Sequence, residues 1–232
     1  MSAAATLQTG IRLRDVSFAY RRGKEILRIS EMAISPGERV FIFGPSGSGK
    51  TTLLGLLAGV LKAGSGSLHI LGRDLTAMRP SERDAFRASH IGYIFQLFNL
   101  IPYLTVLENI TLPCRLSNDR MRRLNGTPMR EAARRVADHL GIGGLLHDGV
   151  VNLSVGQQQR VAAARSLIGT PEVIIADEPT SSLDFDHREK FIELLFQECS
   201  LAQSTLVFVS HDRSLMPMFD RCINLAEMNE VR

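Results

Sequence analysis

The chain has 232 residues and a formal net charge of +3, and 44% of its residues are hydrophobic and 22% charged. These proportions are those of a globular protein, and the length fits one α/β domain with a substantial insertion better than two domains. The longest apolar run, residues 53–61, is far shorter than the roughly 18 residues of a membrane span, and the first ten residues lack a signal-peptide pattern, so we expect a chain that does not cross a membrane.

The first forty residues are expected to form short strands. Residues 11–16 alternate between apolar and polar side chains, and a turn at residues 21–24 leads into a second strand at residues 25–34. A tight turn at residues 36–38 then precedes residues 39–43, which are apolar on both faces as in a central parallel strand. Two later runs, residues 173–176 and 205–209, have the same character. Such strands separated by helices predict a parallel sheet that helices cover on both sides.

Between about residues 102 and 151 the sequence changes character. Ala133, Val136, Ala137 and Leu140 follow helical spacing, and residues 125–128 predict a loop. The region also carries seven arginines, at positions 115, 120, 122, 123, 130, 134 and 135. A nucleic-acid surface is one interpretation, but no aromatic residues for stacking bases are interleaved with the arginines. We therefore expect solvated faces of a small helical region and no nucleic-acid partner.

The cysteines, Cys114, Cys199 and Cys222, lie far apart and match no metal-ligand spacing. Such a sparse, odd number fits packing residues in a reducing compartment.

Residues 44–51 fit the pattern G-x-x-x-x-G-K-[ST] of a phosphate-binding loop. The motif, called the phosphate loop below, consists of Gly44, Pro45, Ser46, Gly47, Ser48, Gly49, Lys50 and Thr51. An apolar strand precedes it, and residues 52–60 after it favour a helix, which places Thr52 beside the nucleotide as well. Glycines let backbone N–H groups turn toward phosphates. We expect Lys50 to neutralise the β- and γ-phosphates and the Thr51 hydroxyl to coordinate Mg²⁺.

The apolar run that begins at residue 173 ends in two carboxylates. Asp177 is expected to hold Mg²⁺ through water, and Glu178 is the natural general base for the attacking water. Before Pro179 such a pair could simply begin a turn or a helix, but the phosphate loop favours the catalytic interpretation. Together the two motifs predict a P-loop NTPase.

A third motif, Leu153-Ser154-Val155-Gly156-Gln157, stands upstream of the Asp-Glu strand and opens a helix. Ser154 and Gln157 fit a capping box, which alone would indicate a well-capped helix. A serine hydroxyl, the small Gly156 and free N–H groups also form an anion site at a helix start. Leu-Ser-x-Gly-Gln in this place resembles the signature of the ABC ATPase family, and the resemblance extends from about residue 11 to residue 226. We call residues 153–157 the signature.

The resemblance implies a dimer in which the signature of one subunit closes over the γ-phosphate held by the phosphate loop of the other. The subunits, identical or paired, would sandwich two Mg-ATP molecules, with Ser154, Gly156 and Gln157 near the nucleotide. Asp184 matches a loop that crosses the dimer interface.

Three further positions match the family. Tyr20 corresponds to the aromatic residue that stacks on adenine, although an exposed strand aromatic is the alternative. Gln96 corresponds to a glutamine that touches Mg²⁺ and the water and senses the membrane partner. His211, which follows a buried strand, corresponds to a switch histidine that contacts the γ-phosphate.

The fold implied by the resemblance is a P-loop ABC ATPase core with a parallel central sheet, an N-terminal antiparallel β-subdomain and an inserted α-helical subdomain. One domain would span residues 1–232, with residues 11–95 and 155–232 in the core and β-subdomain and residues 96–154 in the helical subdomain. Val155 stands where the signature commonly has glycine, and a β-branched residue would be strained if that position needed a positive φ.

Residues 89–102, with residues 104–109 and 112–113, are similar to the LolD and MacB branch of the family. That similarity implies an FtsX-like permease as partner, peripheral attachment at the cytoplasmic face of the inner membrane, and a lipoprotein, peptide or drug as cargo. An amino-acid importer remains an alternative, because such proteins share Phe98-Asn99-Leu100. A soluble ABC ATPase of DNA, ribosomes or iron–sulfur assembly, and a regulatory subunit without turnover, are further alternatives. The chain has no long coiled coil and no room for two ATPase domains, and both catalytic positions, Glu178 and His211, are filled.

Overall fold

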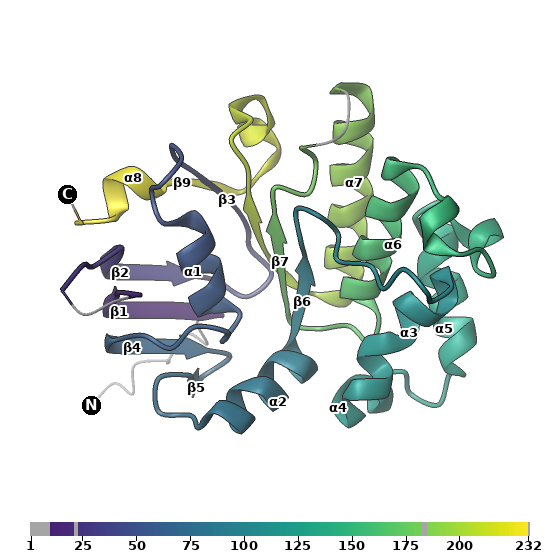
Figure 1. Ribbon diagram of the computed structural model, residues 1–232, viewed down its shortest axis with the longest axis horizontal. Helices are drawn as coiled ribbons and strands as arrows, with labels where there is room; N and C mark the ends of the chain where they lie inside the picture. Colours follow the sequence, from purple (N-terminus) through teal and green to yellow (C-terminus); the bar gives the residue numbers. More distant parts are fainter. Residues whose placement is uncertain (1–9, 21–22, 182–184, 232) are drawn as a thin grey trace, which may run out of the picture.

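Figure 1 shows the computed structural model of the chain, which describes residues 10–20, 23–181 and 185–231. Within these residues the strands form two sheets. One sheet is parallel, with the order β6-β7-β8-β3-β9, and the other is antiparallel, with the order β2-β1-β4-β5. The parallel strands are β3 (Arg39–Phe43), β6 (Ile91–Ile94), β7 (Val173–Asp177), β8 (Thr205–Val209) and β9 (Arg221–Asn224).

The parallel sheet is buried on both faces, as the continuous apolar runs predict. Val40 and Ile42 of β3 join a core cluster with α1 (Lys50–Leu57) and the antiparallel sheet. Phe41 between them joins a second cluster with α6 (Val155–Leu167) and α7 (Phe185–Ala202). In Figure 1, α1 accordingly lies between the two sheets, whereas α6 and α7 lie on the other side of the parallel sheet.

The antiparallel sheet consists of β1 (Ile11–Phe18), β2 (Leu27–Ile34), β4 (Ser65–Ile70) and β5 (Arg73–Asp74). In β1 the buried residues are Ile11, Leu13, Val16 and Phe18, so the alternation skips one position. The pairing of β1 with β4 shifts register between Arg14 and Ser17, which matches this skip. An irregularity of this kind keeps both halves of a strand facing the same core.

The remaining helices are α2 (Pro80–His90), α3 (Val106–Leu116), α4 (Asn118–Arg122), α5 (Met129–His139) and α8 (Leu225–Met228). Short 3-10 helices cover Gly143–Leu145, Val150–Asn152 and Arg213–Met218. Figure 1 places α3 and α5 next to α6, on the side of the parallel sheet away from the antiparallel sheet, and α4 below α3, near α2. In the part of the chain that the structure describes, every helix is too short or too polar to cross a membrane.

A buried arginine joins α4 to the core. The guanidinium of Arg120 donates to the backbone carbonyls of Ala88 and Ile91, around the end of α2, and of Ser166 and Ile168, at the end of α6. Burial lowers the pKa of Arg120 to about 10, because the charged form loses its water. The group remains a cation at neutral pH, and the four carbonyls replace its solvent.

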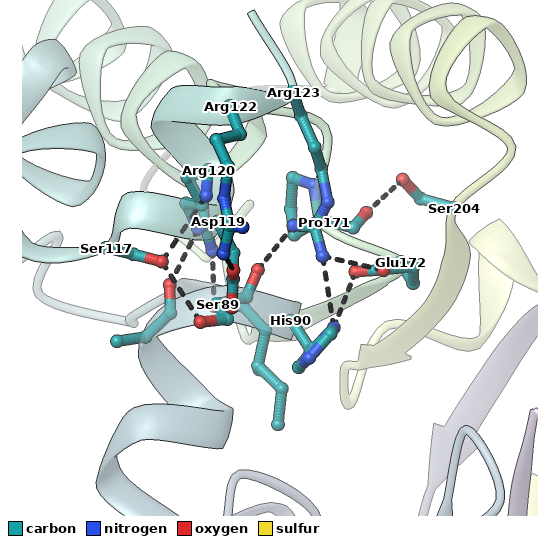
Figure 2. Close-up of polar contacts among 12 residues, drawn as sticks. Ser89, His90, Ser117, Asp119, Arg120, Arg122, Arg123, Pro171, Glu172 and Ser204 are labelled. Carbon is teal, nitrogen blue, oxygen red and sulfur yellow. Dashed lines mark hydrogen bonds and ion pairs between the residues drawn. The ribbon is translucent and has the colours of Figure 1, made fainter.

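Arg123 adds a second connection beside the first (Figure 2). Its guanidinium donates to the carbonyl of Ser89 at 2.6 Å and to the carboxylate of Glu172 at 2.7 Å, while His90 lies 3.1 Å from both groups. Glu172 immediately precedes β7. The two arginines therefore fix the helical region to the ends of α2, α6 and β7.

Candidate functional site

A cleft of about 530 Å³ opens at the carboxyl ends of the parallel strands. It is lined by most of the phosphate loop and by side chains that follow three other strands. The lining residues are Ile26, Gly44, Pro45, Ser46, Gly47, Gly49, Lys50, Thr51, Thr52, Gln96, Asp177, Glu178 and His211. The fold thus brings together groups from β3, β6, β7 and β8, which is the usual place for ligands in open α/β sheets.

The phosphate loop connects β3 to α1 and depends on glycine for its shape. Gly47 and Gly49 have φ angles of 82° and 97°, a region that residues with a side chain rarely adopt. A Cβ at Gly49 would also lie only 3.0 Å from Leu27 Cδ1. Lys50 Nζ donates to the carbonyls of Gly44 at 2.7 Å and Pro45 at 2.9 Å, so its ammonium group lies against the loop.

A residue near the end of the chain supports this loop from the side. Asn229 Nδ2 donates to the carbonyls of Ser48 at 3.2 Å and Ile26 at 3.0 Å. Asn229 Oδ1 accepts from the backbone N–H groups of Arg28 and Val231. One amide therefore fastens the phosphate loop to β2 and to the C-terminal segment. Asn229 was not expected from the sequence, because its partners are distant in the sequence and no local pattern marks them.

Asp177 is the last residue of β7, with its side chain only partly exposed. Burial, and next the charge of Glu178, raise the pKa of Asp177, while a hydrogen bond from Tyr93 and the charge of Lys50 oppose that rise. Tyr93 lies on the neighbouring strand β6, and burial together with Asp177 raises the pKa of its hydroxyl. The phenol therefore keeps its proton and donates to the carboxylate. The sequence analysis missed Tyr93, which a polar tip inside an apolar strand could have suggested.

Glu178 has an unusual backbone conformation. Its φ of 46° is in the left-handed region, where a residue with a side chain is strained by about 1 kcal/mol or more. The Glu178 N–H donates to the carbonyl of Val209 at 2.9 Å, which ties it to the end of β8. Its carboxylate Oε2 lies 2.8 Å from His211 Nδ1. Glu178 is 12% exposed at its side chain and His211 72%, so the carboxylate is sheltered and the imidazole faces the open cleft.

Gln96 and Tyr20 lie at the edges of the cleft. Gln96 follows β6 and is exposed where it lines the cleft. Tyr20 is outside the lining and 62% exposed, but its hydroxyl is 3.4 Å from Thr52 Oγ1, which belongs to the lining. The ring of Tyr20 packs edge-on against Phe18 with centroids 4.9 Å apart. An exposed ring held in this way can present a face to a base.

The signature lies outside the cleft. Ser154 is the N-cap of α6, and its Oγ accepts from the Gln157 N–H at 3.3 Å while Gln157 Oε1 accepts from the Ser154 N–H at 2.8 Å. The predicted capping box is therefore present. Neither Ser154, Gly156 nor Gln157 lines the cleft of its own chain. Asp184 lies outside the described residues.

The anticipated strain at Val155 does not occur. Val155 is the first residue of α6, and its φ is not positive. A β-branched residue is tolerated there because helical φ is within its allowed range. Its side chain is exposed, so it also meets no crowding from the core.

The residues in the cleft fit a magnesium ion. The hydroxyl of Thr51, the amide of Gln96 and the carboxylate of Asp177 all line it, and oxygen donors of this kind are those that Mg²⁺ prefers. Across the described ranges, no three His, Cys, Asp or Glu side chains gather in a way that could hold a metal ion by themselves.

Two of the cysteines are buried and the third is half-buried, and all three are free thiols.

Comparisons with known proteins agree with this geometry. The sequence model of the ABC transporter family matches residues 27–181. The chain is 37% identical to the lipoprotein-releasing system ATP-binding protein LolD of Bacteroides fragilis, over 88% of this chain and 93% of the relative. It is 36% identical to the macrolide export ATP-binding/permease protein MacB of Syntrophobacter fumaroxidans, over 94% of this chain and 30% of the relative.

Among solved structures, the ATP-binding cassette MJ0796, dimeric in a post-hydrolysis state with ADP and Pi, is similar with a TM-score of 0.80 and 32% identity. The match covers 93% of this chain and 95% of the other. The chain therefore belongs to the ABC transporter family of ATP-binding proteins. It is an ATP-hydrolysing nucleotide-binding subunit of the LolD/MacB branch, and the predicted P-loop fold is confirmed.

Proposed function

We propose that the chain works as one half of a dimer that closes around two Mg-ATP molecules and drives a membrane permease. One observation carries the proposal. The cleft gathers the phosphate loop, Gln96, Asp177, Glu178 and His211, whereas Ser154 at the start of α6 lies outside it. A helix start that offers N–H groups and a hydroxyl suits a phosphate. A second copy could supply that helix start to the cleft, as the dimeric state of the MJ0796 cassette also suggests.

Nucleotide binding follows from the loop and its neighbours. The N–H groups of residues 46–51 and the ammonium of Lys50 would neutralise the phosphates, and Tyr20 would stack on the base. Thr51, Gln96 and Asp177 would hold Mg²⁺, and Tyr93 would orient the Asp177 carboxylate. When bound, Mg²⁺ supplies positive charge next to the transferring phosphate.

Glu178 is the proposed general base. Its carboxylate would accept the proton of the attacking water at Oε, and its side chain lines the cleft beside His211. Because the carboxylate is sheltered, its hydrogen bonds are stronger than they would be in water. His211 would contact the γ-phosphate from the exposed side.

The cycle rests on differential binding. ATP at about a hundred times its dissociation constant stabilises the liganded state by about 2.7 kcal/mol per site. If the signature of the partner copy contacts bound ATP but not ADP, this free energy favours the closed dimer. Hydrolysis then removes the γ-phosphate that bridges the two copies.

The permease would attach beside Gln96. Leu97 and Tyr103 are more than four-fifths exposed, and Phe95 is also exposed. Three exposed apolar side chains within residues 95–103 support a contact surface in this stretch, because exposed apolar patches mark interaction sites. The names of the LolD and MacB relatives support a permease of a lipoprotein-releasing or export system. The resemblance of residues 89–113 to that branch implies that this permease is FtsX-like and that the subunit attaches at the cytoplasmic face of the inner membrane.

The test compares the wild type with Glu178→Gln and with Glu131→Gln, an exposed control on α5. Glu178→Gln should lower the ATPase rate by about 10²-fold or more, because a general base is lost. It should also form a dimer, measured by light scattering, only when ATP is present. Normal turnover in Glu178→Gln would contradict the assigned base, and the absence of any ATP-dependent dimer would contradict the sandwich.

A further inference from the structure

Arg165 is a buried cation in the last turn of α6. It is 9% exposed, and its guanidinium donates to the carbonyls of Asn99 at 2.6 Å and Phe98 at 2.5 Å. Within residues 10–20, 23–181 and 185–231, burial lowers the pKa of Arg165 and no charged neighbour opposes this effect. A buried charge is costly unless fixed groups replace its water, so these two carbonyls must be held in place for Arg165 to remain there.

The two carbonyls belong to an unusual stretch of backbone. Phe98 and Asn99 have φ angles of 59° and 47°, so two successive residues with side chains adopt the left-handed conformation. Such residues persist only where the surroundings impose their conformation. The Phe98 side chain is buried in the core, whereas Gln96 and Leu97 just before it are exposed. Arg165 and the burial of Phe98 together fix the end of the loop that carries Gln96.

Arg165 and the signature lie at opposite ends of one helix. Ser154 caps the start of α6, and Arg165 is eleven residues later, about 16 Å along a straight α-helix. A continuous helix moves as a rigid body. A displacement of the signature would therefore reach the carbonyls of Phe98 and Asn99, and through them the adjacent Gln96.

We infer that Arg165 is a positioning residue that couples the signature to Gln96, an inference that rests on the roles proposed above for both. The guanidinium holds the Gln96 loop in its strained conformation, and α6 links this loop to the phosphate-sensing end of the helix. Arg165 touches no nucleotide in this account. It acts by setting where the Gln96 side chain stands in the cleft.

The test uses Arg165→Lys, which retains the charge and an apolar stem but cannot present the planar fork to two carbonyls. Arg160→Lys is the matched control, because Arg160 lies in the same helix and donates to one carbonyl, that of Leu140 at 2.9 Å. We expect Arg165→Lys to lower kcat by about tenfold to a hundredfold, as a displaced catalytic group would. The KM for ATP should stay within about twofold, since the phosphate loop is untouched.

A fluorescent reporter measures the loop directly. The chain has no tryptophan, and Leu97 is 83% exposed, so Leu97→Trp introduces a single indole next to Gln96. We expect its anisotropy to be lower in the Arg165→Lys background than in the Arg160→Lys background, at equal thermal stability. A double-mutant cycle with Gln96→Ala should be non-additive, because Arg165 acts through Gln96.

Equal anisotropy and equal kcat in the two lysine variants would overturn the inference. An additive cycle would overturn it as well, since Arg165 would then act independently of Gln96. If Gln96→Ala alone left kcat unchanged, the proposed role of Gln96 would fail. In that case the anisotropy still decides whether Arg165 holds the loop.

Discussion

The nucleotide cleft and the signature are both built at the ends of regular elements, yet they differ in what a single chain supplies. The cleft receives side chains that follow four parallel strands, and their carboxyl ends meet at one edge of the sheet. In the signature, Ser154 and Gln157 hydrogen-bond to each other through the capping box, while Leu153 packs against the core of its own chain.

The two regions also differ in strain. In the cleft, Glu178 is left-handed and the pKa of Asp177 is raised by burial and by Glu178. At the signature, the capping box satisfies the local donors and Val155 has ordinary helical geometry. The proposed general base therefore carries backbone strain, whereas no residue of the signature has a positive φ.

The largest expected effect is that of Lys50→Met, which removes the cation of the phosphate loop. Hydrolysis should fall by about 10³-fold, because charge stabilisation of the transferring phosphate is lost. Thermal stability should change little, since the hydrogen bonds of Lys50 within the described residues go to two loop carbonyls. ATPase assays and thermal unfolding of the same samples check this. A rate within threefold of the wild type would show that the loop is not the phosphate site.

A pair of capping boxes separates the structural role of Ser154 from its proposed function. Thr105 and Glu108 form the same arrangement at the start of α3. Ser154→Ala and Thr105→Ala should each lower the free energy of unfolding by about 1 kcal/mol. Only Ser154→Ala should also lower the ATPase rate, by about 10²-fold, because it removes a donor to the nucleotide. Equal ATPase rates in the two variants would show that Ser154 acts only as a helix cap.

How much of the cleft and the signature can be predicted from the sequence depends on how far apart in the chain the contacting residues lie. The phosphate loop, the Asp177–Glu178 strand end and the capping box are local patterns, and the apolar runs 39–43 and 205–209 coincide with β3 and β8. The strands β4, β5 and β9 lacked a clear apolar alternation and were not predicted, and β6, a run of only four residues, was not predicted as a strand either. Asn229 and Arg165 act through contacts between distant segments, so no spacing in the sequence reveals them. Tyr93 leaves one local signal, its polar tip inside an apolar run.

Tyr93→Phe tests the support of the cleft by a neighbouring strand. Loss of the hydroxyl leaves Asp177 without its donor, and we expect the Mg²⁺ concentration for half-maximal ATPase to rise about tenfold. Tyr103→Phe is the control, because Tyr103 is exposed and outside the cleft. An unchanged Mg²⁺ dependence in Tyr93→Phe would place the ion elsewhere.

The smallest expected effect concerns stability against pH. Because the pKa of Asp177 is raised in the folded chain, the folded state holds this proton more tightly than the unfolded state, and stability is lost as pH rises through the folded pKa. Asp177→Asn should therefore be more stable than the wild type at pH 7, with the difference shrinking toward pH 4, in urea unfolding.

Asp220 gives stability the opposite dependence on pH. Its hydrogen bond from Arg39 lowers the pKa of Asp220, so its contribution to stability is present above the ordinary pKa and is lost as pH falls. Asp220→Asn should be less stable than the wild type at pH 7. If both substitutions changed the free energy of unfolding at pH 7 in the same direction, the raised pKa assigned to Asp177 would be wrong.

Mixing two inactive variants tests most directly whether the cleft of one chain is completed by the signature of another. Lys50→Met disables the cleft, and Ser154→Arg places a bulky cation at the start of α6 in place of the capping hydroxyl. In a symmetric dimer, half of the molecules in an equal mixture are mixed, and each has one intact cleft facing one intact signature. We expect the mixture to regain up to about a quarter of the wild-type ATPase rate, although each variant alone is inactive. A mixture as inactive as its components would show that the signature does not complete the site of another chain.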